Sequence, residues 1–181
     1  MSDFDSGVAS ELVESSESTG EMTKEYFDHI KKINDVFYDQ IKMSDQKAAY
    51  IFTFMLAFLV TSSEGRGVFT LSRYMDGDYV RICLSALLAS ASIFSILAAI
   101  LVVLPRRVGK STSLFWGAWP QHREDFRRAA DAGSRDYLFG QYLENADTLS
   151  IIACNKYRCV AFAFRGLIVT VLAYVFLLIA M

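Results

Sequence analysis

The sequence has few of the residues that build disulfide frameworks and metal sites: three cysteines and two histidines in 181 residues. Cys83, Cys154 and Cys159 are odd in number and show no metal-ligand spacing, and the histidines lie far from them in sequence. This pattern argues against a metal site and against a disulfide scaffold. The net charge of -2 lacks the basic excess of nucleic-acid binders, so no nucleic-acid partner is expected.

Catalytic constellations are missing as well. An enzyme needs a nucleophile beside a base, paired carboxylates or a set of metal ligands, and a phosphate-binding loop would need clustered glycines. Ser111, Ser113 and Ser134 lie in stretches expected to be flexible. Glu124 and Asp125 are neighbours on a predicted helix and therefore point to different sides. The sequence predicts a protein that is not an enzyme and needs no cofactor.

The first 21 residues hold six acidic side chains and neither lysine nor arginine. A secretory signal needs a positive start followed by an apolar stretch, so this segment is not expected to be one. Low hydrophobicity with charge of one sign instead predicts a disordered acidic tail over residues 1–22. Residues 23–181 are expected to form a single helical membrane domain.

Three apolar runs with very few charges predict an all-α membrane protein with about three transmembrane helices, over residues 48–63, 82–104 and 160–181. The first is short, because at the helical rise it reaches only about 24 Å against a hydrocarbon core of about 30 Å. In the third, Arg165 either snorkels to the headgroups or marks a span that begins at Gly166; snorkelling is favoured because it needs only a bent side chain. The second carries small residues suited to close helix contact, namely Ser85, Ala86, Ala89, Ser90 and Ser92.

The distribution of lysine and arginine predicts the orientation. The segment before the first span holds five of them, residues 105–159 hold nine, and the loop 64–81 holds three. Under the positive-inside rule the N-terminus and residues 105–159 are cytoplasmic, and the C-terminus lies on the opposite side.

A helical cytosolic portion is expected from the N-terminal helix and the segment between spans two and three. No proline or glycine interrupts residues 21–63, so this helix should continue into the first span. One stripe recurs at helical steps along it: Tyr26, Ile30, Ile33, Phe37 and Ile41. Further on, a charged helix over 122–132 is expected to end at Gly133 and Ser134, before a last helix from 134 to 158 that continues into the third span.

Polar residues cluster at the expected cytosolic face of the membrane: Asp45, Lys47, Arg106, Arg107, Asn145, Asn155, Lys156 and Arg158. The positive-inside rule and snorkelling account for most of them. The alternative is a site for a small phosphate-bearing base, in which cations bind the phosphate and Trp116 or Tyr142 stacks on the base. Trp116 and Trp119 fit equally well in an aromatic belt at the membrane interface.

Four short motifs occur in a fixed order around the expected spans. They are Asp45-Gln46-Lys47-Ala48-Ala49, Leu104-Pro105-Arg106, Leu114-Phe115-Trp116-Gly117, and a set that runs from Gln141 through Asn145 to Asn155-Lys156-Tyr157-Arg158. In order and spacing they resemble the transmembrane effectors of bacterial Pycsar antiphage systems. The resemblance extends over about residues 23–181.

In that family a uridylate or cytidylate cyclase makes cyclic UMP or cyclic CMP on phage infection, and the effector then impairs the inner membrane, which results in abortive infection. The resemblance implies a multi-pass protein of the bacterial inner membrane, with the cyclic pyrimidine nucleotide, the cyclase and the lipid bilayer as partners. The positions that match the family pattern are Asp45, Lys47, Phe115, Gly117, Gln141, Asn145 and Lys156. The hypothetical ligand site consists of Asp45, Lys47, Arg106, Trp116, Gln141, Asn145 and Lys156.

The expected mechanism couples cytosolic helices to the spans into which they continue. A ligand that prefers one arrangement of these helices also biases the membrane segments. A short first span thins the lipid locally or favours a homo-oligomer, which provides a route to a pore or a leak. Two other classes of function stay open: a holin-like pore or toxin that acts without nucleotide, and a membrane-anchored adaptor that binds a protein partner.

Overall fold

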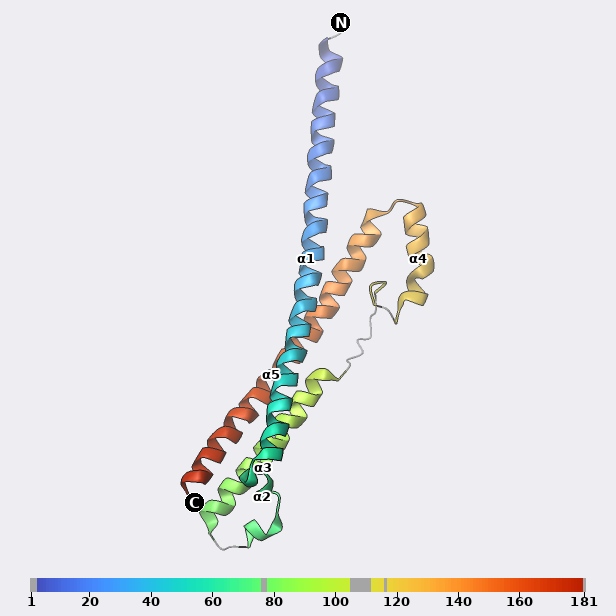
Figure 1. The fold of residues 1–181 in the computed structure, drawn as a ribbon. Helices are drawn as coiled ribbons and strands as arrows, with labels where there is room; N and C mark the ends of the chain where they lie inside the picture. The colour runs from blue at the N-terminus through green and yellow to red at the C-terminus, as the bar shows by residue number, and fades with distance from the viewer. Residues whose placement is uncertain (1–2, 76–77, 105–111, 116, 181) are drawn as a thin grey trace. The chain divides into compact units, whose positions relative to one another are not determined.

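The computed structural model is built of helices (Figure 1). It describes residues 3–75, 78–104, 112–115 and 117–180, with side chains from residue 24 onward. Helix accounts for 88% of the described residues, which contain no strand, and this confirms the expected all-α class. The elements are α1 (Asp3–Thr61), α2 (Ser63–Gly67), the 3-10 turn η1 (Leu71–Tyr74), α3 (Tyr79–Val103), α4 (Trp119–Asp131) and α5 (Arg135–Ile179).

The chain divides into two compact units. Unit 1 comprises Met1–Tyr38 and Val108–Ser150, and unit 2 comprises Asp39–Arg107 and Ile151–Met181. The expectation that both long helices continue without a break into apolar runs is confirmed, since α1 and α5 are each a single helix. Each of these two helices therefore contributes residues to both units.

The N-terminal segment differs from its prediction. Helix α1 begins at Asp3, so residues 3–22, predicted to be disordered, are helical in the structure. The segment contains no proline. An α-helix makes its backbone hydrogen bonds within one segment and needs no apolar partner to do so. The acidic composition indicates a segment without a core, but it does not by itself exclude a helix.

Two helices are long and apolar enough to cross a membrane, α3 and α5. They contain most of the expected spans 82–104 and 160–181. Among the described residues, the part of α1 that contains the expected span 48–63 is not long and apolar enough to meet the same condition. Helix α1 ends at Thr61, and Lys47 precedes its charge-free end, so this apolar stretch is shorter than the other two.

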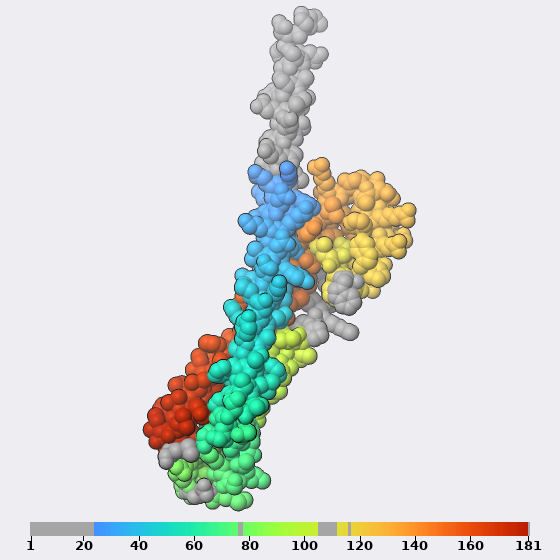
Figure 2. Space-filling model, viewed as in Figure 1, coloured from blue at the N-terminus to red at the C-terminus, as the bar shows by residue number. Residues whose placement is uncertain are grey.

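Unit 2 is formed by α1, α3 and α5, whose apolar side chains share one core. The buried members are Ala48, Ile51, Met55, Ala98, Ala99, Val102, Val160 and Ala163. A second cluster consists of Val68, Leu88, Ala173 and Leu177. In this part of α1, four large apolar side chains are exposed: Tyr50, Phe54, Leu56 and Val60. Figure 2 shows one side of this part of α1 in cyan and teal.

Helices α3 and α5 approach each other closely at small residues. Ser95 donates a hydrogen bond from Oγ to the carbonyl oxygen of Ala163 at 2.8 Å. A Cβ atom added at Gly166 would lie 2.9 Å from the Cβ of Ser95. The predicted small face of α3 is confirmed for Ser85 and Ser92, which are buried, and wrong for Ala86 and Ser90, which are exposed. The buried stripe follows the helical period more closely: Ser85, Leu88, Ser92, Ser95, Ala99 and Val102.

Unit 1 contains α4 and the N-terminal part of α5. Helix α4 begins at Trp119, three residues before the predicted start, because Pro120 is well suited to the first turn of a helix. It ends at Asp131, and the predicted break follows at Gly133, whose φ of 62° permits a Schellman turn. In this turn Ser134 N donates to Ala129 O at 2.9 Å and Gly133 N donates to Ala130 O at 3.1 Å.

On α1 the predicted stripe is partly wrong. Tyr26 is 63% exposed, whereas the neighbouring Phe27 packs edge-on against Tyr142 at a centroid distance of 5.6 Å. Ile30 and Asn34 are buried. The stripe is therefore rotated by about one residue at its start, and it includes a polar side chain.

Candidate functional site

A network of amide and hydroxyl side chains occupies the interior of unit 1. We call it the amide cluster, and its members are Asn34, Thr112, Gln141 and Asn145. Asn145 Nδ2 donates to Asn34 Oδ1 at 2.6 Å, which joins α5 to α1. Thr112 Oγ1 donates to Asn145 Oδ1 at 3.1 Å, and Ser113 N donates to Gln141 Oε1 at 2.7 Å. The cluster thus holds the start of segment 112–115 against α5.

Both side-chain polar atoms of Asn34 form hydrogen bonds within unit 1. Its Nδ2 donates to the carbonyl oxygens of Ile30 and Tyr142, at 2.8 and 3.0 Å, while its Oδ1 accepts from Asn145. A buried amide with these bonds satisfied fixes the helices relative to one another within the unit. The amide cluster is therefore suited to positioning the backbone, and each polar side-chain atom of Asn34 already has a partner within the protein.

A cation and two aromatic rings lie on the same unit. Lys31 Nζ is 4.4 Å from the ring centroid of Phe27 and 5.9 Å from that of Tyr142, which are cation–π distances. All three side chains are only partly buried. A partly exposed lysine beside an aromatic ring can bind a phosphate next to a stacked base.

Unit 2 carries the charged residues of the predicted site. Lys156 Nζ forms an ion pair with Asp45 Oδ1, which joins α5 to α1 about one turn before the apolar core begins at Ala48 and Val160. The Lys156 side chain is 9% exposed and that of Asp45 is 37% exposed. Lys47 is exposed, and its Nζ atom lies 5.4 Å from the ring centroid of Tyr157.

The structure distributes the predicted ligand site over two units. Gln141 and Asn145 lie in unit 1, whereas Asp45, Lys47 and Lys156 lie in unit 2. In unit 1, Asn145 and Gln141 bond to the neighbouring residues Thr112 and Ser113. In unit 2, Asp45 pairs with Lys156, whereas Lys47 lies beside Tyr157. Arg106 and Trp116 lie outside the described residues. Of the other two positions that carry the family resemblance, Phe115 is about half exposed and Gly117 is exposed.

Sequence reasoning missed Asn34, Thr112 and Lys31. One signal for Asn34 was available: it lies four residues after Ile30, within the buried stripe of α1. A polar residue in an apolar stripe has to find hydrogen-bond partners inside the protein. Thr112 and Lys31 gave no such signal, because their partners are distant in sequence or aromatic.

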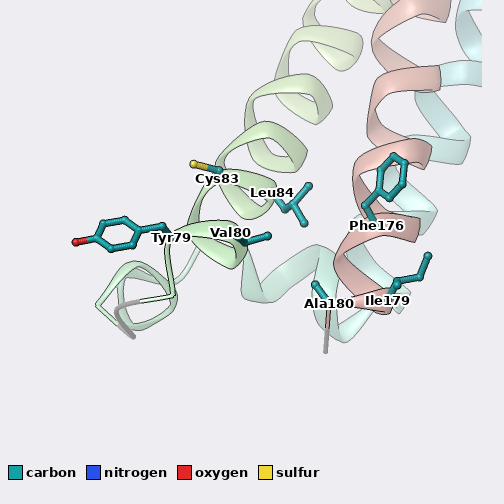
Figure 3. Close-up of a pocket in the computed structure, with 7 residues that line it drawn as sticks. All are labelled: Tyr79, Val80, Cys83, Leu84, Phe176, Ile179 and Ala180. Carbon is teal, nitrogen blue, oxygen red and sulfur yellow. The ribbon is translucent and has the colours of Figure 1, made fainter.

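Hollows that could hold a ligand occur in each unit. The larger, about 550 Å3, lies in unit 2 between the start of α3 and the end of α5 (Figure 3). In Figure 3, Val80 and Leu84 of α3 point toward α5, while Tyr79 and Cys83 point away. The facing side chains are apolar, which suits an acyl chain or an apolar side chain better than a charged nucleotide. The smaller hollow, about 230 Å3, lies in unit 1 at the turn between α4 and α5.

Comparison with known proteins gives one match. Residues 29–181 match the model of the Pycsar effector protein domain, which covers well over half of the chain. The comparison with curated proteins and the comparison with solved structures each gave no match. The matching domain is not a known enzyme family. The resemblance carried by the four short motifs is thus confirmed.

Proposed function

The chain belongs to the Pycsar effector family, and we propose that it is the membrane-impairing component of an antiphage system. A partner cyclase makes cyclic UMP or cyclic CMP on phage infection. The nucleotide binds the cytosolic part of the effector, and the activated effector impairs the bacterial inner membrane. The infected cell then stops growing or dies before phage is released.

The observation that carries this proposal is that α1 and α5 each contribute to both units. In unit 1 their contact includes the hydrogen bond between Asn34 and Asn145, and in unit 2 it includes apolar residues such as Met55 and Ala163. A ligand that favours one arrangement of the two helices in unit 1 can shift their arrangement in unit 2. The shift is limited by the difference in ligand affinity between the two states.

We propose three spans, with the charge-free end of α1 as the first. Tyr50, Phe54 and Val60 of α1 are more than half exposed in unit 2, as expected for side chains that face lipid. The counts of lysine and arginine support a cytoplasmic N-terminus and a periplasmic C-terminus. Unit 1 then lies in the cytosol, where the nucleotide is made.

The damage is proposed to follow from the short first span. A span shorter than the hydrocarbon core is accommodated by local thinning of the bilayer or by association of copies. A homo-oligomer activated by the nucleotide would combine the two effects and open a pore or a leak.

Within this proposal the predicted site residues have different parts. Gln141 and Asn145 position segment 112–115 in unit 1, and the Asp45–Lys156 ion pair transmits strain between α1 and α5 in unit 2. Lys47 is exposed and available to a phosphate. We propose Arg106 as a further cation and Trp116 as a further aromatic side chain for ligand binding.

The direct test is a titration of the purified full chain in detergent with cyclic UMP, cyclic CMP and cyclic AMP, followed by calorimetry and thermal unfolding. Binding to the folded state raises its stability, so a pyrimidine nucleotide should raise the midpoint while cyclic AMP should not. If neither pyrimidine nucleotide binds, the proposal of a nucleotide-activated effector is wrong.

The membrane step is tested in cells with a potential-sensitive dye. Co-expression with an active cyclase should discharge the inner membrane, and co-expression with a catalytically dead cyclase should leave it polarised. Discharge in both cases would favour a holin-like pore that needs no nucleotide. Polarisation in both, together with loss of protection on deletion of residues 1–22, would favour an adaptor that binds a partner through its acidic segment.

A further inference from the structure

The hollow at the α4–α5 turn combines apolar walls with a few polar groups. It is lined by Phe126, Ala129, Ala130, Gly133, Ser134, Arg135, Tyr137 and Leu138. Sites for small organic ligands are mostly apolar, with a small number of polar groups that fix orientation. We propose that this hollow, named the turn pocket, binds the pyrimidine base of the activating nucleotide, an inference that rests on the proposed function.

The shape of the turn pocket follows from the sequence of the turn. The Schellman turn at Gly133 reverses the chain with two backbone hydrogen bonds, so the end of α4 and the start of α5 have a fixed geometry. Ala129 and Ala130 are small, which leaves room beside the larger Tyr137 and Leu138. Phe126 provides an aromatic wall and itself contacts Trp119, at a centroid distance of 5.5 Å. An aromatic wall suits the flat face of a nucleobase.

Tyr137 is one of three polar residues that line the pocket, with Ser134 and Arg135, and it carries a phenolic hydroxyl. This oxygen is buried and has no hydrogen-bond partner among the described residues. Such groups are rare in folded proteins, and a partner that binds from outside is one physical explanation for them. A phenolic hydroxyl both donates and accepts, and uracil and cytosine both carry the carbonyl oxygen O2, to which it can donate. The pocket therefore fits the feature that cyclic UMP and cyclic CMP share.

Size and charge agree with this assignment. A volume of about 230 Å3 is below the range of about 300–1,000 Å3 common for whole drug-sized ligands. It suits a single six-membered ring, with the sugar and the cyclic phosphate at the mouth. Arg135 lies at the start of α5 and is exposed, so its guanidinium can reach a phosphate there.

The contrast with the amide cluster favours the turn pocket. Asn34 has both its donors and its acceptor engaged, and Gln141 already accepts from Ser113. A ligand at the amide cluster would have to displace these bonds. At Tyr137 it would supply one that is missing, which is the more favourable exchange.

Tyr137→Phe removes the hydroxyl alone and provides the test. In calorimetric titrations of the full chain, we expect this variant to bind cyclic UMP or cyclic CMP about three- to tenfold more weakly than the wild type, the worth of one hydrogen bond. Without ligand it should be at least as stable as the wild type, because a buried unpaired hydroxyl has been removed. Tyr26→Phe, the same change at an exposed tyrosine of unit 1, should alter neither property.

A second variant fills the pocket without touching the hydroxyl. Ala130 is exposed, so Ala130→Leu should fold and should weaken nucleotide binding by occupying the space of the base. Equal affinity of the wild type, Tyr137→Phe and Ala130→Leu would overturn the turn pocket and leave the sensor function standing. Absence of nucleotide binding by the wild type itself would overturn both.

Discussion

Asn145 donates a hydrogen bond from Nδ2 to Oδ1 of Asn34 at 2.6 Å, across 111 positions of sequence. Asn34 also bonds to the backbone of both helices, because its Nδ2 donates to the carbonyl oxygen of Ile30 on α1 and to that of Tyr142 on α5. The polar junction of unit 1 therefore depends on a single buried amide whose donors and acceptor all have to point the right way.

This dependence predicts the effect of Asn34→Asp, which keeps the shape of the side chain. The carboxylate cannot donate to the two carbonyl oxygens and places a negative charge beside them, so the free energy of unfolding should fall by about 2 kcal/mol. Chemical denaturation of the purified protein measures it. The matched control is Asp35→Asn at the next, exposed position, which should change stability little. Equal effects of the two changes would show that the amide cluster contributes no specific stability.

The sequence predicted the main helices and the two long apolar stretches in α3 and α5, because both depend on local properties, namely helical periodicity and the length of charge-free runs. It did not predict that Asn34 meets Asn145, nor that Asp45 meets Lys156, because nothing local to one helix specifies its register against another. Family motifs indicated Asp45, Asn145 and Lys156 but not their partners. The rotation of the α1 stripe from Tyr26 to Phe27 has the same origin, since both residues are aromatic and only the packing of Tyr142 distinguishes them.

In the ion pair of unit 2, replacing Asp45 and replacing Lys156 should lower the free energy of unfolding by different amounts. Asp45→Asn leaves the ammonium of Lys156 buried without its counter-charge, whereas Lys156→Met leaves a carboxylate that is one-third exposed and can be hydrated. Asp45→Asn should therefore destabilise the protein more, by about 2 kcal/mol against about 1 kcal/mol. Denaturation of both single variants and of the double variant measures this difference.

In the double variant no buried charge is left unpaired, so its stability should return toward that of the wild type. Additive losses in the double variant would mean that the two side chains do not depend on each other. A larger loss for Lys156→Met than for Asp45→Asn would contradict the proposed effect of burial.

Gly166 and Gly140 form a matched pair on α5. A methyl group at Gly166 would lie 2.9 Å from the Cβ of Ser95 and 3.1 Å from its Cα, so Gly166→Ala should push α3 and α5 apart and cost about 1–3 kcal/mol. Nothing lies within 4 Å of a methyl group at Gly140, and Gly140→Ala should stabilise the helix by about 0.5–1 kcal/mol. Thermal unfolding in detergent should show shifts of opposite sign. Shifts of the same sign would be incompatible with a close helix contact at Gly166.

The first span can be tested by placing one charge at two exposed apolar positions of the same helix. Phe54 is 53% exposed in the charge-free end of α1, and Met43 is 43% exposed before Lys47. An arginine at mid-span costs about 2.5–3.5 kcal/mol on insertion scales, whereas an arginine in water or at the interface costs little. Phe54→Arg should therefore reduce the amount of protein in the membrane fraction and abolish discharge of the membrane potential, and Met43→Arg should do neither.

A topology reporter gives the same comparison an independent readout. Fused after Gly67, it should report the periplasm in the wild type and in Met43→Arg, and lose that location in Phe54→Arg. If Phe54→Arg inserts and acts like Met43→Arg, the end of α1 does not lie in lipid. The chain would then cross the membrane through α3 and α5 alone. With two crossings instead of three, the start of α3 and the end of α5 would lie on the same side of the membrane as the N-terminus. The C-terminus would then be cytoplasmic.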